Sequence, residues 1–229
     1  MLYFIDRSGH FSLVRKGVIL INSIFNSLNS EKQELIINAA IKEFVKSGFE
    51  KASTNEIVKE SKISKGSLFN YFNSKKNLYL YLIEYVVQIV EKIYEQIDLN
   101  ETDIFKRIEK LGLKKLHIQR RFPQVFDFLT SLTYEESDEV KDDIKHKVNF
   151  IVDEGLGKLY ENIDYSKFRE GIDIQKAIDI LNWTMFGFAE RAVNQLNTFE
   201  EVGEQYIKEW ESYSKILKYS FYKYEEDEI

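Results

Sequence analysis

Apolar residues recur at helical spacing along most of the chain after residue 30. The first clear stripe contains Ile36, Ala40 and Phe44, which stand four residues apart. A longer stripe runs through 78–93 with steps of three or four residues. This spacing predicts a series of amphipathic helices that pack against one another around an apolar core.

Capping boxes mark where several of these helices begin. A Ser or Thr is followed three residues later by Glu or Gln at Ser30, Ser53 and Thr198. In such a box, the hydroxyl accepts from a helix amide that has no partner, and the later side chain returns the bond. Ser64 and Ser74 are predicted to begin two further helices.

The remaining signals divide the rest of the chain into helices. Gly48 is expected to end the first helix with a left-handed residue. The long helix from Ser74 is expected to reach about Asp98. Later helices are predicted at 104–121, 123–132, 138–162 with an interruption near Gly155 and Gly157, 173–196 and 199–224.

Composition supports an all-α fold. The chain has 229 residues with 10 glycines and one proline, far fewer turn residues than a β fold needs. It has no cysteine, which excludes disulfides and Cys-ligated metal sites. The longest apolar runs are much shorter than the ~20 residues of a membrane helix. We therefore expect a cytoplasmic protein that does not contact a membrane.

Charge is distributed unevenly along the sequence. The formal net charge is −6, yet residues 30–76 carry nine lysines against six glutamates. A mildly basic front and an acidic body are typical of a chain that places one end on phosphates. Chance clustering would also produce an excess this small.

The basic front contains the spacing of a helix-turn-helix. A short helix from Ser53 is followed by a turn near Lys62 and Ile63 and by a second short helix from Ser64. In DNA-binding examples the second helix lies in the major groove. Spacing alone is equally compatible with a helical hairpin that contacts no DNA.

The residues of this region resemble a known family. The run from Ser53 to Leu78, STNEIVKESKISKGSLFNYFNSKKNL, is similar to the DNA-binding signature of the TetR-family transcriptional regulators. The segment from Ala39 to Phe49 resembles that family's first helix. The resemblance implies an all-helical homodimer with a DNA-binding domain at 30–76 and a ligand-binding and dimerisation domain at 77–229. Residues 1–29 show no sustained periodicity and are expected to form an irregular extension of uncertain order.

The resemblance also implies which residues meet DNA. Four would face base edges: Ser64, Lys65, Gly66 and Phe69. Four would hold phosphates: Thr54, Asn70, Tyr71 and Lys75.

The chemistry of these residues agrees with such roles. Lys65 can donate to a guanine, and Phe69 can contact a thymine methyl. Gly66 permits close approach of the backbone. Lys62 stands where the family commonly has glycine, so it is expected to adopt a positive φ. Phe69 replaces a frequent tyrosine and thereby loses one hydroxyl.

Aromatic residues of the acidic body suggest an effector site. Phe122 and Phe126 flank Pro123, and Trp183 and Phe186 lie on the penultimate predicted helix. Such side chains suit a small apolar or aromatic effector held between helices. Alternatively, each of them belongs to the core, as aromatic residues at helical spacing commonly do.

The last two predicted helices offer a surface for a homodimer. A stripe at helical spacing contains Leu181, Met185, Ala192, Tyr206, Trp210, Tyr213 and Leu217. Two antiparallel helices that meet their symmetry mates would form a four-helix interface. The alternative is that this stripe faces the subunit's own core.

An enzyme is not indicated. The histidines are scattered among different elements, and no metalloprotease, nucleophile-elbow or P-loop motif is present. No cofactor is expected.

The predicted function is a ligand-responsive repressor that binds a near-palindromic DNA operator. The alternative is a helical ligand-binding or interaction protein with a non-functional DNA-binding head. Exposed Lys65 and Tyr71 side chains beside Thr54 would favour the first, and buried ones the second.

Overall fold

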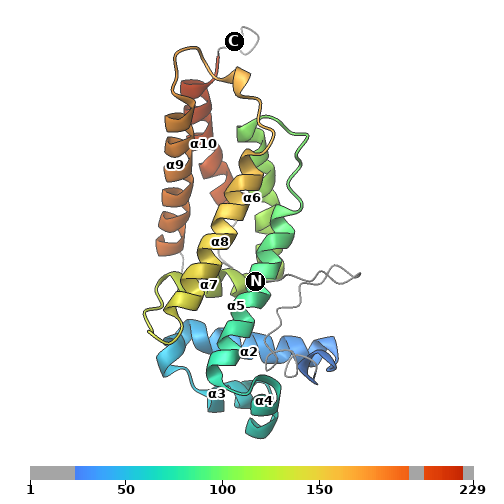
Figure 1. The fold of residues 1–229 in the computed structure, drawn as a ribbon. Coiled ribbons are helices and arrows are strands. Elements are labelled where there is room, and N and C mark those ends of the chain that lie inside the picture. Colours follow the sequence, from blue (N-terminus) through green and yellow to red (C-terminus); the bar gives the residue numbers. More distant parts are fainter. Residues whose placement is uncertain (1–23, 196–203, 224–229) are drawn as a thin grey trace, which may run out of the picture. The chain divides into compact units, whose positions relative to one another are not determined.

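The computed structural model describes residues 24–195 and 204–223, and these residues form an all-α fold (Figure 1). The side chains of 119–121, 123, 192–195 and 204 lie outside the description. In chain order the elements are α2 (Ser30–Lys51), α3 (Thr54–Glu60), α4 (Lys65–Phe72), α5 (Lys75–Tyr94), α6 (Ile104–Arg121), α7 (Pro123–Thr133), α8 (Lys141–Tyr160), the 3-10 turn η1 (Tyr165–Lys167), α9 (Ile174–Gln195) and α10 (Glu204–Phe221). None of the described helices is long and apolar enough to cross a membrane.

Most predicted helix boundaries are confirmed, and the differences have local causes. Ser53 and Ser64 cap α3 and α4 as expected. The first helix is instead capped by Asn29, whose side chain accepts from Lys32 N–H, so the predicted cap at Ser30 is one residue late. Helix α5 ends at Tyr94, earlier than expected. The predicted capping box at Thr198 lies outside the described residues.

The chain divides into two compact units. Unit 1 contains residues 24–86 and 131–146, and unit 2 contains the other described residues, 87–130, 147–195 and 204–223. Helices α5, α7 and α8 each contribute residues to both units. This division reflects packing, whereas the predicted boundary after residue 76 concerns function and stays a prediction.

Aromatic side chains fill much of the interior of unit 1. The fully buried Phe25 has its ring centroid 4.9 Å from that of Phe72, 5.4 Å from Tyr81 and 6.0 Å from Tyr71. Residues 24–26 are helical. The end of the predicted N-terminal extension therefore belongs to the core of unit 1, which corrects the expectation of an irregular segment up to residue 29.

The segment 131–146 is fastened to the end of α2 by polar contacts. The Glu135 carboxylate accepts from Phe49 N–H (2.7 Å) and from Ser137 N–H (3.0 Å). The Ser137 hydroxyl donates to the Glu50 carboxylate at 2.5 Å. These bonds give Glu135 a structural role and tie two segments that are far apart in sequence.

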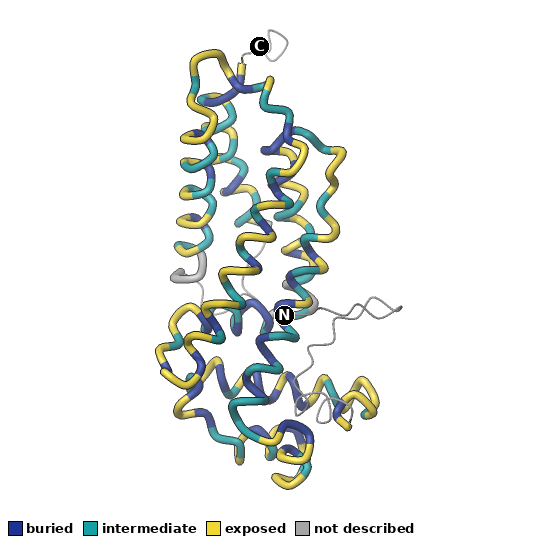
Figure 2. The backbone as a smooth tube through the Cα atoms, in the orientation of Figure 1, coloured by how far each residue is buried: buried dark blue, intermediate teal, exposed yellow. Residues whose placement is uncertain are grey.

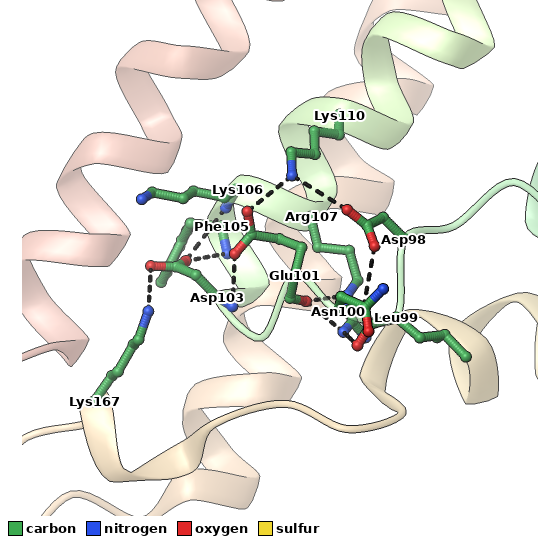
Figure 3. Close-up of polar contacts among 10 residues, drawn as sticks. All are labelled: Asp98, Leu99, Asn100, Glu101, Asp103, Phe105, Lys106, Arg107, Lys110 and Lys167. Atoms are coloured by element: carbon green, nitrogen blue, oxygen red, sulfur yellow. Dashed lines mark hydrogen bonds and ion pairs between the residues drawn. The ribbon is translucent and has the colours of Figure 1, made fainter.

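A buried arginine joins three segments of unit 2. Arg107 of α6 is 1% exposed, and its guanidinium donates only to backbone carbonyls (Figure 3). Nε lies 2.8 Å from the Glu101 carbonyl, Nη1 lies 3.0 Å from that of Leu159, and Nη2 lies 3.3 Å from that of Leu99. Nη1 also donates to Glu161. Arg107 thus supplies donors for carbonyls that precede α6 and that end α8.

Asp103 caps the same helix from a buried position. One carboxylate oxygen accepts from Phe105 N–H (3.0 Å) and Lys106 N–H (3.3 Å), as Figure 3 shows. The other lies 3.3 Å from Lys167 Nζ, and the Tyr222 hydroxyl donates to the carboxylate at 3.3 Å. Burial and the neighbouring Asp103 raise the pKa of Tyr222, so this hydroxyl stays protonated and able to donate.

The stripe predicted as a dimer surface faces the core of its own unit. Five of its seven residues lie in or against this core: Leu181, Met185, Tyr206, Trp210 and Leu217. Leu181 and Trp210 are buried and the other three are half-buried, which favours the alternative that the stripe faces the subunit's own core, and the dimer surface stays a prediction. Tyr213 remains exposed, and the side chain of Ala192 lies outside the description.

Helix α8 is continuous, and its two glycines have different surroundings. The predicted interruption near Gly155 and Gly157 is absent from Lys141–Tyr160. A Cβ on Gly155 would overlap the ring of Tyr94, whereas a Cβ on Gly157 would meet nothing within 4 Å. Gly155 is therefore explained by close packing of α5 against α8.

This difference gives a matched pair of substitutions. Gly155→Ala is expected to lower the free energy of unfolding by ~1–3 kcal/mol, because the Tyr94 ring must move. Gly157→Ala is expected to raise it by ~0.5–1 kcal/mol, since alanine is the better helix former. Urea denaturation followed by circular dichroism measures both. Equal effects of the two substitutions would contradict the packing at Gly155.

Candidate nucleic-acid interface

The helix-turn-helix of unit 1 is built by α3, a short turn and α4. Helix α3 ends in a bond from Ile63 N–H to the Val58 carbonyl (3.1 Å) and one from Lys62 N–H to the Lys59 carbonyl (3.4 Å). This pair of bonds forms a Schellman motif, which places a left-handed residue after the helix. Lys62 has a φ of 54°, which confirms the positive φ predicted for it.

Caps and a carboxylate from α2 fix where the two short helices start. Ser64 Oγ accepts from Ser67 N–H at 2.9 Å, and Ser53 Oγ accepts from Glu56 N–H at 3.4 Å. Glu43 of α2 accepts from Ser53 N–H at 2.8 Å, so the first helix positions the start of α3.

An ion pair adds a second link between α2 and α3. Lys42 Nζ lies 2.9 Å from the Glu60 carboxylate. The hydrogen bond and charge of Lys42 hold the pKa of Glu60 below its usual value. Both side chains are exposed, so this pair adds little to stability.

The first part of α4 presents a polar, accessible surface. Ser64, Lys65, Gly66 and Asn70 are exposed, and Phe69 is 39% exposed although it is a large apolar side chain. The buried residues of this helix are Leu68, Tyr71 and Phe72. Helix α4 therefore packs by one face and offers most of the residues predicted to read DNA on the other.

Gly66 has no steric reason to be glycine. A Cβ built on it would meet only the Ser64 hydroxyl oxygen at 3.8 Å, an ordinary contact, and its φ lies outside the left-handed region. Since the fold accepts a side chain there, the absence of one at this exposed helix start is compatible with close approach of another molecule.

The residues predicted to hold phosphates differ in their surroundings. Asn70 is exposed, and Thr54 is half-buried at the start of α3. Lys75 is half-buried, donates to the Glu50 carbonyl at 2.9 Å and lies 4.8 Å from the centre of the Phe49 ring. Lys75 thus already has partners within unit 1.

Tyr71 is buried, which differs from the arrangement expected of a DNA-binding head. It is 8% exposed, and its ring packs against Phe25 and Phe72. The exposed Lys65 favours a DNA-binding regulator, whereas the buried Tyr71 favours a protein with a non-functional DNA-binding head. A phosphate contact by Tyr71 stays a prediction and is less well supported than one by Asn70.

The four aromatic residues predicted at an effector site do not share one environment. Phe126 is buried and Phe122 is half-buried, whereas Trp183 is 71% and Phe186 47% exposed. An enclosed pocket would not leave two of its walls this accessible. The effector site stays a prediction, and exposure gives Trp183 and Phe186 less support as its walls than Phe122 and Phe126.

Exposed apolar residues recur on α9 and α10: Ile180, Trp183, Phe186, Tyr213, Ile216 and Tyr219. The sequence had pointed to Trp183, Phe186 and Tyr213 in other roles, whereas Ile180, Ile216 and Tyr219 were missed. Figure 2 shows exposed positions recurring along α9, the helix that packs beside α10. The steps of three from Ile180 to Trp183 and from Ile216 to Tyr219 were available as a signal, but the more continuous inward stripe concealed them.

Arg191 links α9 to α10 next to this surface. Its guanidinium pairs with Glu209 and donates to the Tyr213 hydroxyl at 3.3 Å. The hydrogen bond and charge of Glu209 raise the pKa of Arg191. Arg191 therefore orients Tyr213 at the edge of the exposed surface.

The residues of this interface are similar in sequence to a family of bacterial regulatory proteins. Residues 36–82 match the profile described as bacterial regulatory proteins, tetR family. The chain is 32% identical over 151 residues to YerO, an uncharacterised HTH-type transcriptional regulator of Bacillus subtilis. That match covers 63% of this chain and 49% of YerO, so the chain spans about half the length of this curated relative.

Solved structures show the same fold. A TetR family transcriptional regulator from Chloroflexus aurantiacus is 20% identical with a TM-score of 0.61, over 88% of this chain and 98% of that one. The transcriptional regulator FadR from Bacillus subtilis, in complex with stearoyl-CoA, is 18% identical with a TM-score of 0.52, over 80% and 96% respectively.

Proposed function

Because the chain belongs to the TetR family of bacterial transcriptional regulators, we propose that it is a repressor that binds an operator through the exposed surface of α4. The observation that carries this proposal is the set of exposed residues at the start of α4, with Lys65 and Gly66 in the first turn. A lysine there can donate to guanine O6 or N7, and the neighbouring glycine lets the backbone approach the groove.

The start of α4 also suits contact with phosphates. The amides of the first helical turn carry partial positive charge, and Ser64 and Asn70 add uncharged donors. Residues 30–76 have an excess of lysine over glutamate, which supports DNA as a partner despite the acidic chain as a whole.

A two-fold dimer supplies the second recognition helix. We place its interface on the exposed residues of α9 and α10, including Trp183 and Ile216, in place of the buried stripe. Large exposed apolar residues on two adjacent helices are typical of a surface that meets a partner. The same surface on both copies gives an isologous four-helix contact and a near-palindromic operator.

A small-molecule effector releases the operator in this proposal. FadR, which has the same fold, is a precedent for a ligand-bound protein of this kind. Helix α5 contributes to both units, so it is a covalent route from effector to head. The effector must prefer the non-binding state, and a coupling of ~1–3 kcal/mol changes operator affinity ~5–150-fold.

The function is tested by selecting bound DNA from a random-sequence pool with the intact protein. The expected result is an enriched pair of inverted half-sites, and retardation of that DNA that weakens steeply as salt rises. No enriched sequence, together with equal and weak retardation of all DNA, would favour the helical ligand-binding protein with a non-functional head. The burial of Tyr71 is the observation that favours this second function.

A further inference from the structure

A lysine occupies the left-handed position in the turn between α3 and α4. Lys62 has a φ of 54°. The other described residues with a positive φ are Gly48, Asn73, Asn162 and Gly171, which belong to the two residue types that adopt this conformation most readily. Lys62 is the exception among them, and its backbone conformation costs free energy that a glycine would not require.

The fold does not explain why this position has a side chain. Lys62 is exposed, and within residues 24–195 and 204–223 its ammonium group has no hydrogen-bond acceptor, carboxylate or aromatic ring as a partner. The Schellman motif uses only the backbone N–H of Lys62, which a glycine would supply equally well. The side chain therefore adds no polar contact to the turn that requires it.

The surroundings of the turn are rich in lysine. Lys59 and Lys65 stand three residues before and after Lys62, and both are exposed. The nearest carboxylate along the chain, Glu60, already accepts from Lys42 of α2 at 2.9 Å. The turn thus concentrates positive charge while its neighbouring carboxylate has a partner elsewhere, an arrangement that attracts a polyanion.

The turn also lies next to the surface of α4 that is proposed to read DNA. Lys62 is two residues before Ser64, so their Cα atoms are at most about 7 Å apart. In a helix-turn-helix, the first helix crosses the phosphate backbone and the N-terminal residues of the second contact base edges. The turn that joins the two helices is therefore held at the edge of the groove, where the phosphates lie.

We propose that Lys62 contacts a DNA phosphate at the edge of the groove that α4 enters. The inference deepens the proposed function, on which it rests, by adding the turn to the surface that contacts DNA. A phosphate contact positions the head and carries no sequence information. The unfavourable backbone of Lys62 in the free protein thus accompanies a cation that acts only in the complex.

Lys62→Gly tests this contact because stability and affinity should change in opposite directions. The variant should unfold at a higher urea concentration, since glycine adopts a positive φ freely. Its affinity for the selected operator should fall about fivefold for each bound copy at 0.15 M salt, and the slope of log affinity against log salt should fall by about one for each copy. An unrelated duplex should lose affinity by a similar factor, because every sequence has phosphates.

Two further variants control for the removal of charge. Lys62→Arg keeps the cation and should restore both the affinity and the salt slope. Lys46→Ala removes an exposed lysine of α2, outside the helix-turn-helix, and should leave both unchanged. Full affinity and salt slope in Lys62→Gly, or an equal loss in Lys46→Ala, would overturn the inference. A Lys62→Gly variant less stable than the unsubstituted protein would do so too, because the side chain would then serve the fold.

The same assays separate this inference from the repressor function. Operator selection by the unsubstituted protein, with no effect of Lys62→Gly, would leave the repressor function in place and remove the contact. Weak retardation of all DNA that still depends on Lys62 would support the contact and contradict the repressor function. A protein that retards no DNA at all would overturn both.

Discussion

Arg107→Met is expected to lower the free energy of unfolding by about 3–5 kcal/mol, the largest stability effect of any substitution considered. Methionine keeps much of the volume but donates nothing. The carbonyls of Glu101, Leu159 and Glu161 would then lose the Arg107 donor, whereas the Leu99 carbonyl would keep its bond from the Asn162 side-chain amide at 3.0 Å. Urea denaturation followed by circular dichroism measures the loss.

A nearby lysine provides the control for Arg107. Lys110 is drawn in the same cluster in Figure 3 and pairs with Glu101 (2.9 Å) and Asp98 (3.6 Å), but it is exposed. Exposed pairs contribute ~0–1 kcal/mol, so Lys110→Met should change stability little. Similar losses in the two variants would show that burial of the Arg107 guanidinium does not determine its contribution.

The largest effect on DNA binding is expected from opening the proposed dimer. Trp183→Glu combined with Ile216→Glu places carboxylates on both exposed helices, where the two copies would bring like charges together. The double variant should sediment as a monomer. Its affinity for the selected operator should fall by about 10²–10⁴-fold, because the second half-site is no longer bound within the same complex.

Phe150→Glu is the matched control for this surface. Phe150 is an exposed aromatic residue of α8, which is not one of the two helices proposed to meet a second copy. It should remain dimeric and keep its operator affinity. A double variant that stays dimeric would place the interface elsewhere, and a monomer with full affinity would show that the operator does not require two copies.

Local signals predicted the DNA-binding head well. The caps at Ser53 and Ser64 and the positive φ at Lys62 depend on neighbouring residues, so the sequence contains nearly all the information needed. The continuous helix at Gly155 was missed for the opposite reason. Its glycine is explained by a ring from α5, and no local pattern records such a contact.

Residues 77–229 were harder to predict because several of their helices carry apolar residues on more than one side. On α9, Leu181 faces the core while Trp183, two residues later, is exposed. The spacing of apolar residues reveals both apolar sides of such a helix, but it does not indicate which side packs against the subunit's own core. The sequence therefore identified both helices but not which apolar side of each helix stays exposed.

The central claim is that the start of α4 approaches DNA closely, and Gly66→Ala tests it most directly. The fold has room for this methyl group, so the variant should be as stable as the unsubstituted protein. Gly157→Ala, on α8, is the control for adding a methyl group elsewhere. A shift assay on the selected operator should show at least a tenfold loss of affinity for Gly66→Ala and none for Gly157→Ala. Full operator affinity in a stable Gly66→Ala variant would contradict the account.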